Sequence, residues 1–205
     1  MGRCTDRLQV GHQSSPRDHN SRENDMNLWL RLCKVILSSF LRPKLRYLDH
    51  SHQQFMVWPN DLDFNLHMNN ARYLAVMDLG RVDLILRTEL GRVVYRHHLK
   101  PLLASVMVRF RRPLAPFQGF TLVSRVIGWD TRWTYIEHRI ESRGALVCLA
   151  IAKVAFLGKN GLMPTTELMA LMGVLPQSLP LPEWLITWAE CEDKFYHQAE
   201  SEPRP

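Results

Sequence analysis

The sequence lacks several patterns that would assign a chemistry directly. Its four cysteines are far apart and form no C-x-x-C pair, which excludes a zinc knuckle and a dithiol redox motif. It contains no G-x-S-x-G stretch, so the nucleophile motif of a large class of serine hydrolases is absent. The chain also has no internal repeat and no clear secretory signal, and we therefore expect reduced thiols and a cytoplasmic location.

The composition is that of an ordinary soluble globular protein. Of 205 residues, 46% are hydrophobic and 22% are charged, which allows one domain with a sizeable core. The net charge of +6 is compatible with an anionic ligand such as a nucleotide phosphate, or with a membrane surface. Because no nucleic-acid-binding motif accompanies this charge, we expect no nucleic acid partner.

The N-terminal part of the chain divides into two segments. Residues 1–25 are polar and show no apolar periodicity, which predicts a disordered leader, and Met1 and Met26 are both candidate start sites. Residues 26–50 begin with apolar side chains at helical spacing and end in a basic stretch, which predicts an amphipathic helix. The apolar part is too short and too charged to predict a transmembrane helix. Two interpretations stay open: packing on the domain or a partner, and peripheral membrane contact through residues 26–41.

Residues 51–162 predict one α+β domain. A short strand ends at Pro59, and a long, mostly apolar helix runs from Ala71 to about Leu90. The glycine inside this helix, Gly80, costs helix stability and indicates a close approach of the helix backbone to a sheet.

Strand patterns follow the long helix. We expect at least four antiparallel strands, in segments 104–114, 121–130, 132–142 and 145–158. A tight connection at Asp130–Thr131 predicts a hairpin between the second and third of them. The Pro-rich and amphipathic remainder, residues 163–205, predicts a C-terminal helical extension.

The segment WPNDLDFNLHMNNARYL, residues 58–74, concentrates hydrogen-bonding side chains just before the long helix. An aspartate at this place lies beside unpaired backbone N–H groups and the positive end of the helix dipole. Those N–H groups can polarise a carbonyl oxygen, while the carboxylate acts as a general base on water or attacks the carbonyl itself. The segment therefore predicts a minimal acyl-transfer site. The alternative stays open: Asp61, Asp63 and Asn65 form Asx turns, and the asparagines after them cap the helix.

Part of this segment, DLDFNLHMNNARYL, resembles the active-site signature of the hotdog-fold acyl-CoA thioesterases, in the 4-hydroxybenzoyl-CoA thioesterase branch. The later stretch VRFRRPLAPFQGFTLVSRVIGWD is similar to a run of strands in the same family. The resemblance spans roughly residues 54–158 and looks closest to the group called thioesterase superfamily member six. It implies a hotdog fold, in which a long central helix is wrapped by a curved antiparallel β-sheet, here with accessory N- and C-terminal helices.

The resemblance also implies roles for residues of the turn and the helix. The family's catalytic carboxylate matches Asp63, and polar residues that line the family's site match His67 and Asn69. An aromatic of the first helical turn matches Tyr73, and an acidic position on the central helix matches Asp78. We therefore expect catalytic residues Asp63, His67 and Asn69, and substrate-binding residues Met68, Asn70, Tyr73 and Asp78, with backbone N–H groups of residues 68–70 polarising the thioester.

Alternatives remain for some of these residues. His67 fits a structural hydrogen bond that pins the turn as well as it fits catalysis. Asp78 suits a structural role, or a contribution from a partner subunit, better than the role of primary base. Many family members have Gly where this chain has Leu66, and a Gly there lets the thioester approach the backbone closely. The leucine therefore bears either on the efficiency of hydrolysis or on the exact position of the oxyanion hole.

Metal and coenzyme binding were considered beside the turn. The pair His97–His98 has no carboxylate or cysteine at ligand spacing, so we expect no metal and no bound cofactor. The three arginines Arg109, Arg111 and Arg112 suit a solvated strand edge, with binding of coenzyme A phosphates as the alternative.

The function expected from the sequence is hydrolysis of an acyl-CoA thioester to free acid and coenzyme A. The alternative is a non-catalytic hotdog scaffold that binds acyl groups or protein partners. The resemblance implies a homodimer or a dimer of dimers, in which sheets joined edge to edge leave no exposed strand edge. The acyl chain length and the carrier, coenzyme A or acyl-carrier protein, are not encoded in any pattern of the sequence.

Overall fold

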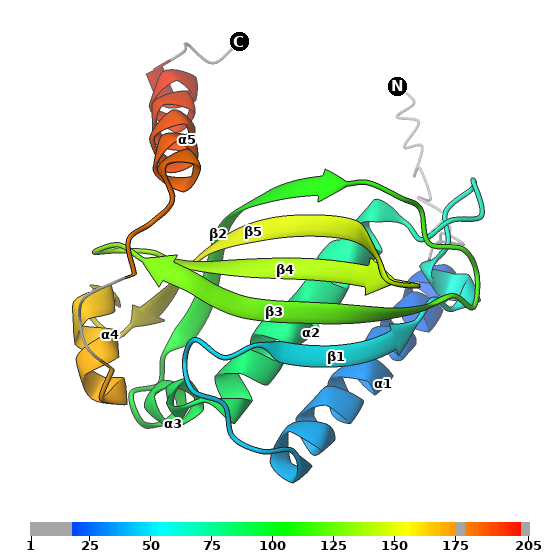
Figure 1. Cartoon of the computed structure of the whole chain (residues 1–205), viewed down its shortest axis with the longest axis horizontal. Coiled ribbons are helices and arrows are strands. Elements are labelled where there is room, and N and C mark those ends of the chain that lie inside the picture. Colours follow the sequence, from blue (N-terminus) through cyan, green and yellow to red (C-terminus); the bar gives the residue numbers. More distant parts are fainter. Residues whose placement is uncertain (1–17, 175–178, 202–205) are drawn as a thin grey trace, which may run out of the picture.

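The computed structural model describes residues 18–174 and 179–201. Its centre is a six-stranded antiparallel sheet with the order β1-β3-β4-β5-β2, in which the short β6 pairs with β5. Figure 1 shows these strands curving over α2, the long helix Asn70–Arg87. The strands are β1 (Ser51–Met56), β2 (Lys100–Phe110), β3 (Gly119–Trp129), β4 (Thr134–Ser142), β5 (Ala145–Gly158) and β6 (Gly161–Leu162). The predicted α+β fold, a long central helix wrapped by a curved antiparallel sheet, is confirmed.

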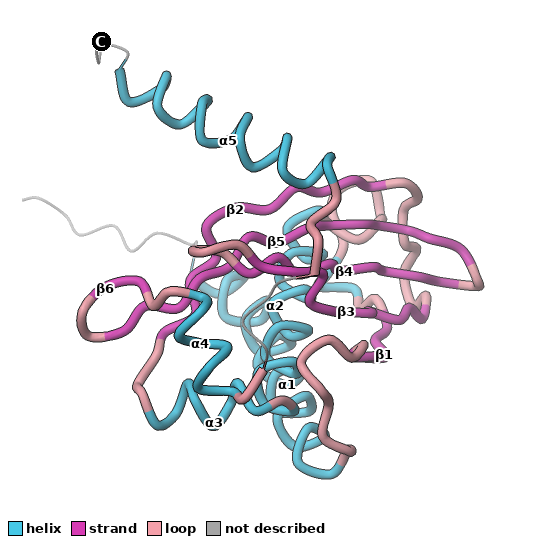
Figure 2. The backbone as a smooth tube through the Cα atoms, turned by 60° about the vertical axis from the view of Figure 1, so that its left-hand side comes forward, coloured by secondary structure: helices cyan, strands magenta, loops and turns pink. Residues whose placement is uncertain are grey.

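The other helices lie around this unit. Helix α1 (Asp18–Leu41) runs beside α2, and α3 (Glu89–Arg96) contacts α4 (Thr165–Met172) at one end of the sheet. Figure 2 shows α5 (Glu183–Ser201) on the side of the sheet opposite α2. Its buried Leu185 packs with Tyr135 and Ile151 on that outer face.

The packing of α2 on the sheet depends on Gly80. A Cβ atom at this position would lie 2.4 Å from Ser124 Oγ and 2.7 Å from Leu122 Cδ2, both on β3. Because protein interiors are close-packed, a larger residue fits here only if the neighbouring atoms move. The close approach of helix and sheet that Gly80 predicted is therefore confirmed.

The hydrophobic core has two main parts along α2. The first surrounds the N-terminal turns of the helix and includes Tyr73, Met68 and Leu114. The second surrounds its C-terminal turns and includes Leu84 and Phe156. The first part supports the polar turn that precedes the helix, and the second part encloses a cavity.

Some element boundaries differ from those that the sequence predicted. Helix α1 begins at Asp18, so only residues 1–17 of the expected disordered leader lie outside the described residues. Helix α2 ends at Arg87 and not near Leu90, because Thr88 has an extended backbone (φ −106°, ψ 172°) and its hydroxyl donates to the Leu84 carbonyl. In the described part of the chain, no helix has an apolar stretch long enough to cross a membrane.

Candidate active site

The polar turn between β1 and α2 is held by its own backbone. Leu62 and Met68 form an isolated antiparallel bridge, and Asp63 N–H donates to the His67 carbonyl at 2.9 Å. Met68 N–H donates to the Leu114 carbonyl at 2.9 Å, which ties the turn to the segment after β2. Residues 64–67, at the tip of the turn, are exposed.

Asp61 anchors the turn from inside. Its side chain is 1% exposed, and its Oδ2 lies 2.5 Å from Nη2 of the nearly buried Arg31 on α1. The same oxygen accepts Trp58 N–H at 2.9 Å, and Arg31 also donates to the Met56 carbonyl at 2.8 Å. The carbonyl of Asp61 accepts Asn69 N–H at 2.8 Å. Asp61 therefore connects α1, the end of β1 and the start of α2, and its role is to position the turn.

Asp63, the second aspartate of the turn, is arranged differently. Its Oδ1 accepts the backbone N–H of Asn65 at 2.8 Å and that of His67 at 3.4 Å, which forms an Asx turn. Within the described part of the chain, its Oδ2 makes no hydrogen bond. One carboxylate oxygen thus holds the turn, and the other is available to a substrate or a water molecule.

A groove of about 350 Å³ lies beside this carboxylate. It is formed by the turn, the first turn of α2 and the residues that end β2. Its lining residues are Asp63, Asn65, His67, Met68, Asn70, Tyr73, Phe110, Arg111, Arg112 and Pro113. Five of the seven residues predicted for the site, all except Asn69 and Asp78, are therefore brought together.

Tyr73 forms the inner wall of the groove. Its side chain is 2% exposed, and its ring packs edge-on against Phe110 with the centroids 5.2 Å apart. Burial raises the pKa of Tyr73 to about 12; a hydrogen bond with the Leu114 backbone opposes this rise, and the nearby Cys148 and Asp63 add to it. The hydroxyl is therefore neutral near pH 7 and lies close enough to Asp63 to sense its charge.

The backbone N–H groups expected to polarise a carbonyl are only partly available. Met68 N–H donates to the Leu114 carbonyl and Asn69 N–H to the Asp61 carbonyl, so both are already bonded. Asn70 N–H, at the start of α2, makes no hydrogen bond in the described part of the chain. The expected set of donors at 68–70 is therefore reduced to Asn70 N–H, at the positive end of the helix dipole.

Asn69 and Asp78 lie away from the groove. The side chain of Asn69 caps α2, since its Oδ1 accepts Ala71 N–H at 2.8 Å. Asp78, two turns further along α2, pairs with Arg81 and borders a separate cavity. His67 lines the groove, and its imidazole makes no hydrogen bond in the described part of the chain.

The sequence reasoning missed part of the groove. Phe110, for which the sequence indicated no role, is 42% exposed and borders the groove. Arg111 and Arg112 were assigned to a solvated edge. Their backbone N–H groups both donate to the Val147 carbonyl, at 2.8 and 3.2 Å, and their side chains line the groove beside the turn. The position of this RFRRP stretch directly after a strand was the available signal.

Among the described residues, no group of three or more His, Cys, Asp or Glu side chains is arranged to hold a metal ion.

Known proteins share sequence and fold with this chain. A model of the thioesterase-like superfamily matches residues 57–189. A Xenopus laevis protein named THEM6 is 25% identical over 182 residues, which cover 87% of this chain and 86% of that protein. A probable thioesterase of Saccharomyces cerevisiae is 27% identical over 104 residues, which cover 50% of this chain and 45% of the yeast protein.

A solved structure shares the fold. The probable thioesterase YbaW of Escherichia coli superposes with a TM-score of 0.55 and 20% identity, covering 59% of this chain and 97% of that one. The superposition thus leaves about two fifths of this chain without a counterpart in that structure.

Proposed function

The chain belongs to the thioesterase-like superfamily, and we propose that it hydrolyses an acyl-CoA thioester to a free acid and coenzyme A. The observation that carries this proposal is the carboxylate of Asp63: one oxygen is held by the turn, and the other is unengaged beside a groove at the N-terminus of α2. A carboxylate next to a helix N-terminus supplies both a base and an electrophilic contact.

In the proposed reaction, Asp63 acts in one of two ways. As a general base, it takes a proton from water while the water oxygen attacks the thioester carbonyl carbon, and it returns that proton to the thiolate after the C–S bond breaks. As a nucleophile, it attacks the carbonyl itself and forms a mixed anhydride, which water then hydrolyses. In both cases Asn70 N–H stabilises the negative charge on the carbonyl oxygen. His67 and the neutral Tyr73 hydroxyl, which line the same groove, orient the water or the thioester.

Charge near the groove supports coenzyme A as the carrier. Arg111 and Arg112 are exposed and line the groove at the end of β2. Guanidinium groups bind phosphates through several donors at once, and coenzyme A carries phosphates at a distance from its thiol. The thioester can therefore lie by Asp63 while the nucleotide part contacts these arginines.

A homodimer formed through β2 is part of the proposal. In the described part of the chain, β2 pairs with β5 on one side and leaves its other edge open. Leu102, Leu103 and Phe110 on this strand are each more than 40% exposed. Antiparallel pairing with the same strand of a second copy covers this edge. It also brings the groove at the Phe110 end of one copy towards the cavity at the Leu102 end of the other.

Helix α1 has a second, outward face. Trp29, Leu30, Leu37, Phe40 and Leu41 are 64–87% exposed, whereas Val35 on the opposite side is fully buried. The inner face agrees with packing on the domain, the first of the two interpretations for this segment. Peripheral membrane contact through the outer face stays a prediction, as does the cytoplasmic location.

The test is thiol release from a panel of short, long and aromatic acyl-CoAs. We expect Asp63→Asn to lower kcat/KM by at least about 10²-fold, because the amide keeps the Asx-turn acceptor but is neither a base nor a nucleophile. The control is Asp49→Asn, which changes an exposed aspartate that also accepts a backbone N–H, that of Arg46, outside the groove. Unchanged turnover of folded Asp63→Asn would refute the role of this residue. Absence of hydrolysis across the whole panel would favour the non-catalytic acyl-binding scaffold.

A further inference from the structure

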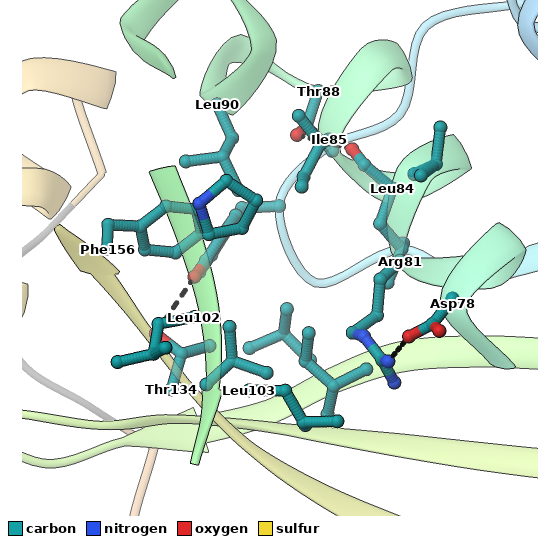
Figure 3. Close-up of a pocket in the computed structure, with 16 residues that line it drawn as sticks. Asp78, Arg81, Leu84, Ile85, Thr88, Leu90, Leu102, Leu103, Thr134 and Phe156 are labelled. Atoms are coloured by element: carbon teal, nitrogen blue, oxygen red, sulfur yellow. Dashed lines mark hydrogen bonds and ion pairs between the residues drawn. The ribbon is translucent and has the colours of Figure 1, made fainter. Parts of the chain in front are cut away.

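A separate cavity of about 260 Å³ lies between the C-terminal half of α2 and the sheet (Figure 3). Its walls are mainly aliphatic and aromatic side chains of α2, α3, β2, β3, β4 and β5. The apolar lining residues are Val82, Leu84, Ile85, Leu90, Pro101, Leu102, Leu103, Val126, Ile136, Val154 and Phe156. The cavity shares no lining residue with the groove at Asp63.

Two hydroxyl groups lie at the inner end of this cavity. Tyr47 and Thr134 are 7% and 2% exposed, and their oxygens are 3.5 Å apart. A good O–H···O hydrogen bond has its oxygens about 2.5–3.0 Å apart, so this contact leaves both groups with unused capacity. Burial raises the pKa of Tyr47 to about 12, and the contact with Thr134 opposes this rise, so the phenol is neutral and can donate. Thr88, a further hydroxyl in the lining, is already committed to the Leu84 carbonyl at 2.7 Å.

The exposed part of the lining lies at Asp78 and Leu102, and it carries no net charge because Asp78 is paired with Arg81. Asp78, whose side chain is 62% exposed, pairs with Arg81, and Figure 3 shows this pair away from Thr134. Arg81 also donates to Nε2 of the buried His138 at 3.3 Å, and His138 Nδ1 lies 2.8 Å from Ser124 Oγ. Since an arginine can only donate, Nε2 is the acceptor and the neutral ring carries its proton on Nδ1. The guanidinium is therefore already paired, and the opening does not favour an anionic chain end.

The unused hydroxyls have a physical consequence for a ligand. Buried polar groups without good partners are costly in apolar surroundings. A plain alkyl chain that fills the cavity leaves this cost unchanged. A chain with an oxygen at its far end supplies the missing hydrogen bonds, so its binding is stronger.

We propose that this cavity binds the acyl chain of the substrate, and that Tyr47 and Thr134 select chains of medium length with a hydroxyl or keto oxygen at or next to the terminal carbon. The cavity volume is about 260 Å³. If each carbon group of the acyl chain takes about 30 Å³, the volume of one water molecule in the liquid, the cavity holds roughly eight or nine of them. The inference rests on the proposed function, and the acyl chain enters past Asp78 and Leu102. In the β2-paired dimer, the Asp63 groove of the second copy then lies next to this entrance, so that its carboxylate acts on the thioester of the bound chain.

The first measurement compares kcat/KM for octanoyl-CoA and ω-hydroxyoctanoyl-CoA. We expect the wild-type protein to favour the hydroxylated substrate by about three- to tenfold, the effect of one to two buried hydrogen bonds. The near-isosteric variants Tyr47→Phe and Thr134→Val should each reduce this ratio to near one. Tyr95→Phe, which removes the hydroxyl of an 82% exposed tyrosine outside the cavity, is the matched control and should keep the preference.

The second measurement needs no turnover. Calorimetric titration with octanoate and ω-hydroxyoctanoate should show the same preference in the wild-type protein and its loss in both cavity variants. If this preference is found but neither thioester is hydrolysed, the proposed function fails and the cavity assignment stands. If both thioesters are hydrolysed equally well and both acids bind equally, the assignment of Tyr47 and Thr134 is overturned and the proposed function stands. Thermal unfolding of each variant checks that the fold is retained.

Discussion

The two ends of α2 border hollows that differ in almost every physical respect. The groove at its N-terminus is polar and depends largely on one continuous turn, residues 61–70, with side chains from the end of β2. The cavity along its later turns is apolar and is formed by side chains from two helices and four strands that are far apart in the sequence. The comparison indicates that reactive groups can be arranged by local hydrogen bonds, whereas the space for a ligand requires the whole fold.

The two aspartates of the turn also differ from each other. Asp61 and Asp63 are separated by one residue, yet the first is buried against Arg31 and the second keeps an unengaged oxygen beside the groove. The sequence pattern D-x-D therefore combines a buried anchor with a carboxylate that borders the groove. Substitutions that keep size and remove charge can separate these two roles.

The largest effect on stability is expected for Asp61→Asn. This change leaves the buried guanidinium of Arg31 without its carboxylate, and removing one member of a buried ion pair typically costs about 3–5 kcal/mol of unfolding free energy. For Asp63→Asn we expect less than about 0.5 kcal/mol, because the amide oxygen can still accept Asn65 N–H. Urea unfolding of both variants measures the difference.

A matched variant makes this comparison sharper. Arg31→Met removes the other member of the pair, so its effect and that of Asp61→Asn should be far from additive in the double variant. Equal stabilities of Asp61→Asn and Asp63→Asn would show that the two aspartates do not differ as described.

The parts of the fold and site that could be predicted from the sequence are those that depend on residues close together in the chain. The turn was identified from sequence because its chemistry lies in adjacent residues, and the glycine of α2 indicated the close contact with β3. The partner of Asp61 is Arg31, thirty residues earlier on another helix, and no local pattern joins them. The cavity was missed for the same reason, since Tyr47 and Thr134 meet only when the strands curl. The sequence did suggest Asn69 as an N-cap residue, which is the role that its side chain has in the structure.

A smaller effect, dependent on pH, is expected at His138, which contacts the cavity-lining Arg81. Burial lowers the pKa of His138 from 6.5 to about 3, with a further contribution from the charge of Arg81. Between these values the unfolded chain binds more protons than the folded one, so the stabilisation is complete above about pH 6.5 and is lost as the pH falls. Lowering the pH from 6.5 to 5 should therefore cost about 2 kcal/mol of unfolding free energy through this group alone.

The variant His138→Gln isolates this contribution. An amide can accept from Arg81 and donate to Ser124 but does not titrate, so its unfolding free energy should fall less steeply with decreasing pH than that of the wild-type protein. His97→Gln, which changes an exposed histidine, should keep the wild-type slope. Parallel pH profiles for all three proteins would contradict the buried, neutral state of His138.

The smallest effect is expected at the tip of the turn. Leu66 has φ = 58°, in the left-handed region where a side chain costs about 1–2 kcal/mol. Leu66→Gly removes this strain but adds about 0.5–1 kcal/mol of backbone entropy cost, which leaves a gain of at most about 1.5 kcal/mol. The side chain is 68% exposed, so little packing is lost. A thermal unfolding scan measures this gain, and a clear decrease in stability would show that Leu66 makes a contact that outweighs its strain.

The ion pair between α1 and the turn has a consequence for where the functional unit starts. The superfamily match begins at residue 57, after both α1 and β1. A fragment that begins there keeps Asp61 and Asp63 but loses Arg31, so the anchoring carboxylate faces an empty space where the guanidinium was. Helix α1 therefore braces the polar turn between β1 and α2 through this buried pair, and a fragment without the helix lacks the buried partner of Asp61.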